Sequence, residues 1–155
     1  MSESIGIEQK PVVAGPFRIL LVEDSPTDAD LALRALSRSR HDNQVVHVND
    51  GVSALSSLRN SGEQLAGPPD LILLDLNMPR MDGRGVLREL RTDERLQLIP
   101  VVVLSTSGEE RDITSAYSLG ANAYVVKPVD LVQFYAVIQG ILDFWVGIAA
   151  MCHGR

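Results

Sequence analysis

Five short apolar runs, each followed by a segment of helical character, constrain the fold of this chain more than any other feature. The apolar runs lie near residues 17–22, 44–48, 70–75, 99–104 and 122–126, and the helical segments near 26–39, 51–60, 83–92, 109–118 and 130–149. Strands that alternate with helices in this way are typical of an α/β domain, in which helices cover both faces of a parallel sheet. The sequence therefore predicts an α/β fold with one parallel sheet.

Local residues support these boundaries. Ser25 followed by Pro26 is typical of a helix that begins with a capping hydroxyl and a proline in its first position. Asp130 is placed to cap the last helix. Residues 1–16, with two glycines and two prolines, are expected to be a flexible N-terminal segment. Residues 17–149 are expected to form the folded domain, and residues 150–155 a tail without an output domain.

Composition narrows the class of protein. A length of 155 residues suits one domain. The net charge of −6, without a dense block of Lys and Arg, argues against nucleic-acid binding. No apolar run reaches the roughly 18 residues of a membrane span, and the first residues lack the features of a secretory signal. Because Cys152 is the only cysteine, no disulfide forms within the chain, and we expect a cytoplasmic protein.

Ionisable side chains follow several of the apolar runs. Glu23 and Asp24 follow the first run, Asp75 ends the third, Ser105 follows the fourth, and Lys127 follows the fifth. Carboxyl ends of parallel strands lie at one edge of a sheet, where ligands bind. Three carboxylates so close together require a cation, and Mg²⁺ prefers oxygen ligands. A carboxylate beside that cation is a competent phosphoryl acceptor, which would give an aspartyl phosphate.

Each of these residues has an ordinary explanation when it is taken alone. An Asp that follows a strand is most often a turn former or a helix cap, a Ser is most often an N-cap, and a Lys is most often a solvated surface charge. The functional interpretation depends on finding them together at successive strand ends. As a set they indicate a phosphoryl-acceptor site.

Four motifs carry a family resemblance. They are Leu21-Val-Glu-Asp, Leu73-Leu-Asp-Leu-Asn-Met-Pro-Arg-Met-Asp-Gly, Ser105-Thr, and Gly120-Ala-Asn-Ala-Tyr-Val-Val-Lys-Pro. Over about residues 17–148 the chain resembles the receiver domain of two-component response regulators. That resemblance implies a flavodoxin-like receiver fold, whose five-stranded parallel sheet has the strand order 2-1-3-4-5.

The resemblance also implies roles for the acidic residues. Asp75 would be the phosphoacceptor, and Glu23, Asp24 and Asp75 would hold Mg²⁺, with Mn²⁺ or Ca²⁺ as substitutes. Asn77 would complete the metal site through its backbone carbonyl. Such a protein is a phosphoacceptor in signalling and not a turnover enzyme, because it catalyses only its own phosphorylation and a slow autodephosphorylation.

Four further residues match phosphate-binding and switch positions of this family. Lys127 would bind the phosphate and precede a cis bond to Pro128. Ser105 would be the switch hydroxyl, and Tyr124 the aromatic residue that turns inward with it, although Tyr124 would also serve as a packed strand residue. Thr106 is larger than the residue common at its position, so we expect it to slow dephosphorylation.

The last helix has a wider apolar surface than packing against the sheet requires. Apolar side chains spread over roughly 200° of it, whereas one sheet-facing helix needs little more than 100°. The surplus surface predicts a homodimer through the last strand and helix, although the tail or residues 105–115 offer an alternative cover within one chain. The expected interface residues are Phe134, Ile138, Ile141, Phe144 and Trp145.

Three longer sequence segments point to a subgroup of this family. Leu20-Leu-Val-Glu-Asp-Ser-Pro-Thr-Asp-Ala-Asp-Leu, Ser105-Thr-Ser-Gly-Glu-Glu and Asp143-Phe-Trp resemble single-domain regulators that are paired with phytochrome histidine kinases in bacteria and cyanobacteria. The implied partner is a sensor histidine kinase, and the subgroup suggests a bacteriophytochrome as that kinase. The expected output is changed dimerisation or partner binding, since the chain ends soon after its fifth helix.

Three alternatives stay open at this point. The chain could be an intermediate phosphorelay carrier for another sensor kinase. A haloacid dehalogenase type of Mg²⁺-dependent hydrolase also uses a strand-end Asp, but it needs a second Asp where this chain has Asn77. A flavin-binding protein of similar topology needs a Ser-, Thr- and Gly-rich loop where this chain has Glu23 and Asp24, whose charge would repel phosphate.

Overall fold

The computed structural model describes residues 15–60 and 67–151, and within them five strands alternate with five helices. The predicted α/β architecture is confirmed, and the bounds of its elements differ from the expected ones by at most two residues. The elements are β1 (Phe17–Val22), α1 (Pro26–Ser37), β2 (Asn43–Val48), α2 (Gly51–Arg59), β3 (Leu71–Leu74), α3 (Gly83–Thr92), β4 (Val101–Ser105), α4 (Glu110–Ser118), β5 (Ala123–Val126) and α5 (Leu131–Gly147).

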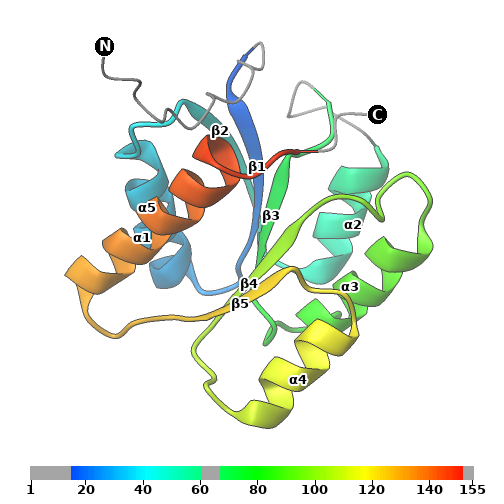
Figure 1. Cartoon of the computed structure of the whole chain (residues 1–155). Helices are drawn as coiled ribbons and strands as arrows, with labels where there is room; N and C mark the ends of the chain where they lie inside the picture. Colours follow the sequence, from blue (N-terminus) through cyan, green and yellow to red (C-terminus); the bar gives the residue numbers. More distant parts are fainter. Residues whose placement is uncertain (1–14, 61–66, 152–155) are drawn as a thin grey trace, which may run out of the picture.

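The strands form one parallel sheet in the order β2-β1-β3-β4-β5. The strand order that the resemblance implied is therefore confirmed. Figure 1 shows α1 and α5 on one face of this sheet and α2, α3 and α4 on the other. The chain reverses direction across the sheet between β1 and β3, which is the switch point where ligands bind in open α/β sheets.

The sheet separates two apolar cores. Leu20, Val22, Ile72 and Leu74 pack with the α2–α3–α4 side, and the alternate residues of the same strands pack with the α1–α5 side. This alternation follows from the two-residue period of a strand. Because both faces are covered, β1 is apolar from Ile19 onward and β3 is apolar throughout, and ionisable groups follow at their carboxyl ends.

Side-chain caps fix where four helices begin. Ser25 Oγ accepts a hydrogen bond from the backbone N–H of Asp28 (3.3 Å), and the Asp130 side chain accepts one from the N–H of Gln133 (3.0 Å). Both predicted caps are confirmed. Asp50 and Asp82 cap α2 and α3 in the same way. Such caps typically stabilise a helix by about 1 kcal/mol each.

Gly83 allows the first turn of α3 to press against the end of β3. A Cβ atom at this position would lie 2.4 Å from the backbone oxygen of Asp75 and 2.8 Å from Cα of Leu76. Both contacts are with backbone, so a side chain at residue 83 would displace the segment that carries Asp75. The Gly83 N–H also donates to the Leu76 carbonyl oxygen (2.8 Å), which holds the turn closed.

The structure corrects most of the predicted dimer interface. Phe134, Ile138 and Ile141 are 5%, 0% and 9% exposed within a single chain, so they belong to the core and the prediction is wrong for them. The physical reason is that α5 packs against α1 as well as against the sheet, which buries a wider arc. Phe144 is 49% exposed and Trp145 is half-buried, and these two stay a prediction.

The described residues include no helix that is both long enough and apolar enough to cross a membrane. The predicted flexible segment 1–16 lies outside the described residues except for its last two positions, and so does most of the predicted tail 150–155.

Candidate functional site

The backbone of the sheet carries the predicted site residues to one edge. The N–H of Glu23 donates to the carbonyl oxygen of Val48 (3.0 Å). The N–H of Asp75 donates to the carbonyl oxygen of Val22 (3.0 Å). The N–H of Lys127 donates to the Ser105 carbonyl oxygen (2.7 Å). Each residue is thus tied to the end of a neighbouring strand, as expected for the carboxyl edge of a parallel sheet.

Three carboxylates meet at this edge. Glu23, Asp24 and Asp75 each offer an oxygen, and these oxygens all lie within 4.8 Å of one another. Glu23 and Asp75 are only 4% and 9% exposed. Glu23 Oε2 is buried and has no hydrogen-bond partner in the described structure. A buried oxygen without a donor is costly, and a cation would satisfy it. The donor set therefore fits a hard divalent metal ion.

The pKa of Asp75 reflects this crowding. The pKa of Asp75 is raised from its ordinary 3.8 to about 7, mainly by burial and then by the hydrogen bond and the charge of Glu23. The charge of Lys127 and the N–H of Asn77, which donates to Asp75 Oδ1 (3.4 Å), act in the opposite direction. Near neutral pH the carboxyl of Asp75 is therefore partly protonated unless more positive charge arrives.

Asn77 lies two residues beyond Asp75 and is exposed. Its N–H contact with Asp75 places its backbone beside the acidic cluster. The predicted contact of its carbonyl oxygen with a metal ion stays a prediction.

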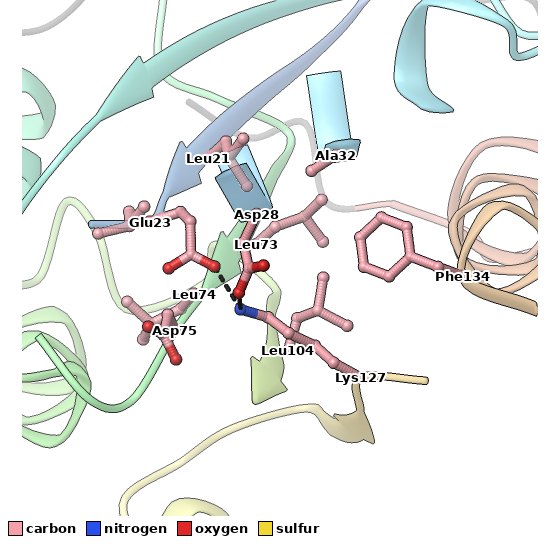
Figure 2. A pocket seen from close by; sticks show the side chains of 11 residues that line it. Leu21, Glu23, Asp28, Ala32, Leu73, Leu74, Asp75, Leu104, Lys127 and Phe134 are labelled. Carbon is pink, nitrogen blue, oxygen red and sulfur yellow. Dashed lines mark hydrogen bonds and ion pairs between the residues drawn. The ribbon is translucent and has the colours of Figure 1, made fainter. Parts of the chain in front are cut away.

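Lys127 lies between two carboxylates. Its side chain is 7% exposed, and its ammonium forms ion pairs with Glu23 and with Asp28 Oδ2, the latter at 3.0 Å. Figure 2 shows the ammonium between these two carboxylates, in a pocket that Asp75 also lines. Burial alone would lower the pKa of Lys127, but the hydrogen bonds and charges of Glu23, Asp28 and Asp75 raise it overall. Lys127 is therefore charged.

Sequence reasoning missed Asp28. It lies in the first turn of α1, where an acidic residue is ordinarily explained by the helix dipole. The side chain instead reaches Lys127 across the pocket that also contains Glu23 and Asp75 (Figure 2). The available signal was its position four residues after Asp24, in the first turn of α1.

A chain of contacts connects the predicted switch residues. Ser105 is fully buried, and its Oγ accepts a hydrogen bond from the N–H of Ser107 (3.2 Å). The Tyr124 hydroxyl donates to the Ser107 carbonyl oxygen (2.8 Å). Ser107 Oγ donates to Asp112 Oδ2 (2.5 Å). Ser107, which was not singled out from the sequence, thus links Ser105 to Tyr124 and to α4. Thr106, between the two serines, is exposed.

One expectation drawn from the resemblance is wrong in this structure. The described residues contain no cis peptide bond, so the bond between Lys127 and Pro128 is trans. A proline permits a cis bond but still favours trans.

Comparison with known proteins shows which family the chain is similar to. The family model described as response regulator receiver domain matches residues 19–139. Response regulator Rcp1 of Synechocystis is 43% identical over 132 residues, which cover 84% of this chain and 90% of that protein.

Solved structures give the same result. The crystal structure of the phosphorylated cyanobacterial phytochrome response regulator RcpA has a TM-score of 0.82 and 46% identity, with 88% of this chain and 99% of that chain covered. The Mn²⁺-bound form of Rcp1 has a TM-score of 0.79 and 41% identity, with the same two shares covered.

Proposed function

Since this chain belongs to the response regulator receiver family, we propose that it receives a phosphoryl group from a histidine kinase on Asp75 and signals through the resulting change in binding. The observation that carries this proposal is the cluster of Glu23, Asp24 and Asp75, two of them buried, beside the charged Lys127. A divalent cation would satisfy the spare carboxylate oxygen of Glu23, and the ammonium could then pair with a phosphoryl oxygen in place of a carboxylate.

The proposed transfer is a displacement at phosphorus. A carboxylate oxygen of Asp75 attacks the phosphoryl group of the kinase's phosphohistidine, and a new P–O bond forms. The P–N bond breaks, its electron pair stays on the imidazole nitrogen, and that nitrogen takes up a proton from water. Asp75 must be ionised for this attack, whereas its pKa of about 7 leaves it partly protonated at neutral pH.

A divalent cation, proposed to be Mg²⁺, would be held by Glu23, Asp24 and Asp75 and would neutralise charge on the transferred group. Its positive charge would also favour the ionised form of Asp75. The Mn²⁺-bound structure of the relative Rcp1 supports a divalent ion in this site. Within the chain itself, Lys127 supplies a positive charge that can turn toward phosphoryl oxygens.

The proposed donor is a histidine kinase of the phytochrome class. The support is that the similar structure of RcpA is described as a phytochrome response regulator and as phosphorylated. Transfer from a kinase of another class, and onward transfer to a second histidine, would instead indicate a phosphorelay carrier.

Labelling with ³²P tests the proposal. The wild-type chain, mixed with a phosphorylated bacteriophytochrome kinase or with acetyl phosphate, should acquire an acid-labile, alkali-sensitive label only when Mg²⁺ is present. The Asp75→Asn variant should fall to background, since its amide is not a nucleophile. Asp30→Asn, an exposed change of the same charge on α1, is the matched control and should label normally. Retained label in Asp75→Asn would refute the assignment.

We also propose a homodimer that uses the exposed part of α5. Phe144 and Ile148 are 49% and 71% exposed, and Phe144 packs edge-on against Trp145. Burial of such aromatic area typically contributes a few kcal/mol, at about 25 cal/mol per Å². Sedimentation with and without beryllofluoride tests this proposal. A pure monomer at high concentration in both states would exclude it, and Phe144→Ser should weaken any dimer.

A further inference from the structure

Asp28 holds the lysine that the proposed phosphoryl group needs. Its carboxylate lies 3.0 Å from the Lys127 ammonium, across the gap between α1 and the end of β5. In the described structure the hydrogen bonds of the ammonium go to Glu23 and Asp28, and none goes to Asp75. The group that would contact phosphate is thus held between Glu23, which follows β1, and Asp28 of α1 (Figure 2).

The electrostatic setting makes this contact consequential. The Lys127 side chain is 7% exposed, whereas that of Asp28 is 35% exposed at the mouth of the pocket. Asp28 also adds a fourth carboxylate to an edge that already carries Glu23, Asp24 and Asp75. A phosphoryl group on Asp75 brings further negative charge. Asp28 would repel that group and would also hold the Lys127 ammonium away from it.

We propose that Asp28 is a positioning residue that competes with the phosphoryl group for Lys127 and so sets how tightly the phosphorylated state is held. The inference rests on the proposed function, since it needs an anionic group on Asp75. When that group arrives, the ammonium exchanges its hydrogen bond with Asp28 for one with a phosphoryl oxygen. Asp28 is then left at the mouth of the pocket, where water can solvate it.

Beryllofluoride, which mimics a phosphoryl group on a carboxylate, provides the test. Its dissociation constant is measured by calorimetry at saturating Mg²⁺ for the wild-type chain and for two variants. Asp28→Asn keeps an acceptor for Lys127 without the charge, and Asp28→Ala removes both. Each should bind beryllofluoride about three- to tenfold more tightly, the range expected for loss of one partly exposed competing ion pair.

Asp30→Asn is the matched control, because Asp30 lies on the same helix, is 57% exposed and pairs with Arg34 rather than with Lys127. It should bind beryllofluoride within about twofold of wild type, as expected for an exposed charge. A second readout is Mg²⁺ binding without beryllofluoride. Both Asp28 variants should bind Mg²⁺ more weakly, because a negative charge is lost and Lys127 is freed toward the acidic cluster. A merely damaged pocket would weaken both ligands.

The proposal is overturned if either Asp28 variant binds beryllofluoride as wild type does, or more weakly, while its thermal unfolding shows a folded chain. Failure of the proposed function has a different signature. In that case the wild-type chain itself would bind no beryllofluoride, or Asp75→Asn would bind it equally well.

Discussion

The two ends of β3 each carry a buried aspartate, and the two residues have opposite surroundings. Asp70 precedes the strand and is 5% exposed, and Asp75 follows it and is 9% exposed. Asp70 accepts hydrogen bonds from the Arg18 backbone N–H (2.9 Å) and from its guanidinium (3.4 Å). Asp75 instead faces Glu23, and its pKa is raised to about 7. Burial of a carboxylate is common to both, so burial alone does not identify the functional residue.

The partner decides the role. At the entry of the strand a cation and a backbone N–H satisfy the carboxylate, so Asp70 stabilises the fold. At the exit, two further carboxylates leave negative charge uncompensated, so Asp75 is poised for a ligand. The repulsion between carboxylates at Asp75 lowers the stability of the metal-free chain. A bound cation would relieve this repulsion, which would strengthen its binding.

Neutralising each aspartate in turn should change stability in opposite directions. Asp70→Asn should lower the free energy of unfolding by about 2 kcal/mol, because Arg18 loses a buried charged partner. Asp75→Asn, without metal at pH 8, should raise it by a similar amount, about 2 kcal/mol, because a buried like-charge contact disappears. Urea unfolding measures both. A loss of stability in both variants would show that the two ends do not differ as described.

The pH dependence of stability should separate the two ends further. The folded pKa of Asp75, about 7, lies above the ordinary 3.8, so between these values the folded chain binds more protons than the unfolded chain. Its contribution to stability therefore falls as pH rises through this window and is lost above about 7. Between pH 5.5 and 8 the metal-free wild type should lose about 2 kcal/mol relative to Asp75→Asn.

Urea unfolding in EDTA at several pH values provides this measurement, with Asp70→Asn as the comparison. Asp70→Asn should keep the same slope as wild type, since Asp75 is intact. Saturating Mg²⁺ should flatten the slope of wild type. An identical slope in wild type and Asp75→Asn would contradict the assignment of the raised pKa.

A smaller effect, on the lifetime of the phosphoryl group, is expected at Thr106, which lies at the same edge of the sheet as Asp75. Its side chain is exposed and directly follows the buried Ser105. If it narrows the path for water, Thr106→Ala should shorten the lifetime of the phosphoryl group by about threefold, a barrier change below 1 kcal/mol. Decay of the ³²P label measures this, with Thr114→Ala on α4 as a matched exposed control. Equal decay in wild type and Thr106→Ala would remove the steric explanation.

The order of strands and helices could be predicted from the sequence because apolar runs and helix caps are local signals. The acidic cluster could also be predicted, since strand ends of a parallel sheet meet at one edge. Asp28 and Ser107 could not, because their roles depend on which side chain lies across a gap. Three of the five predicted interface residues on α5 were wrong for a related reason. A helical wheel gives the width of an apolar arc but does not tell how much of it a neighbouring helix covers. On α5 that neighbour is α1, whose Ala35 carbonyl oxygen accepts a hydrogen bond from Gln139 (2.9 Å).

The contact between Tyr124 and Ser107 makes the Tyr124 ring a suitable position for an NMR label that reports on the loop. The tyrosine hydroxyl reaches the loop whose next hydrogen bond goes to Ser105, yet the ring lies on β5 and outside the acidic cluster. A fluorine atom on this ring would therefore sense whether the loop has moved while it leaves the chemistry of Asp75 untouched. One ¹⁹F resonance could then report the proposed rearrangement of this loop in real time, also in a mixture with the proposed kinase.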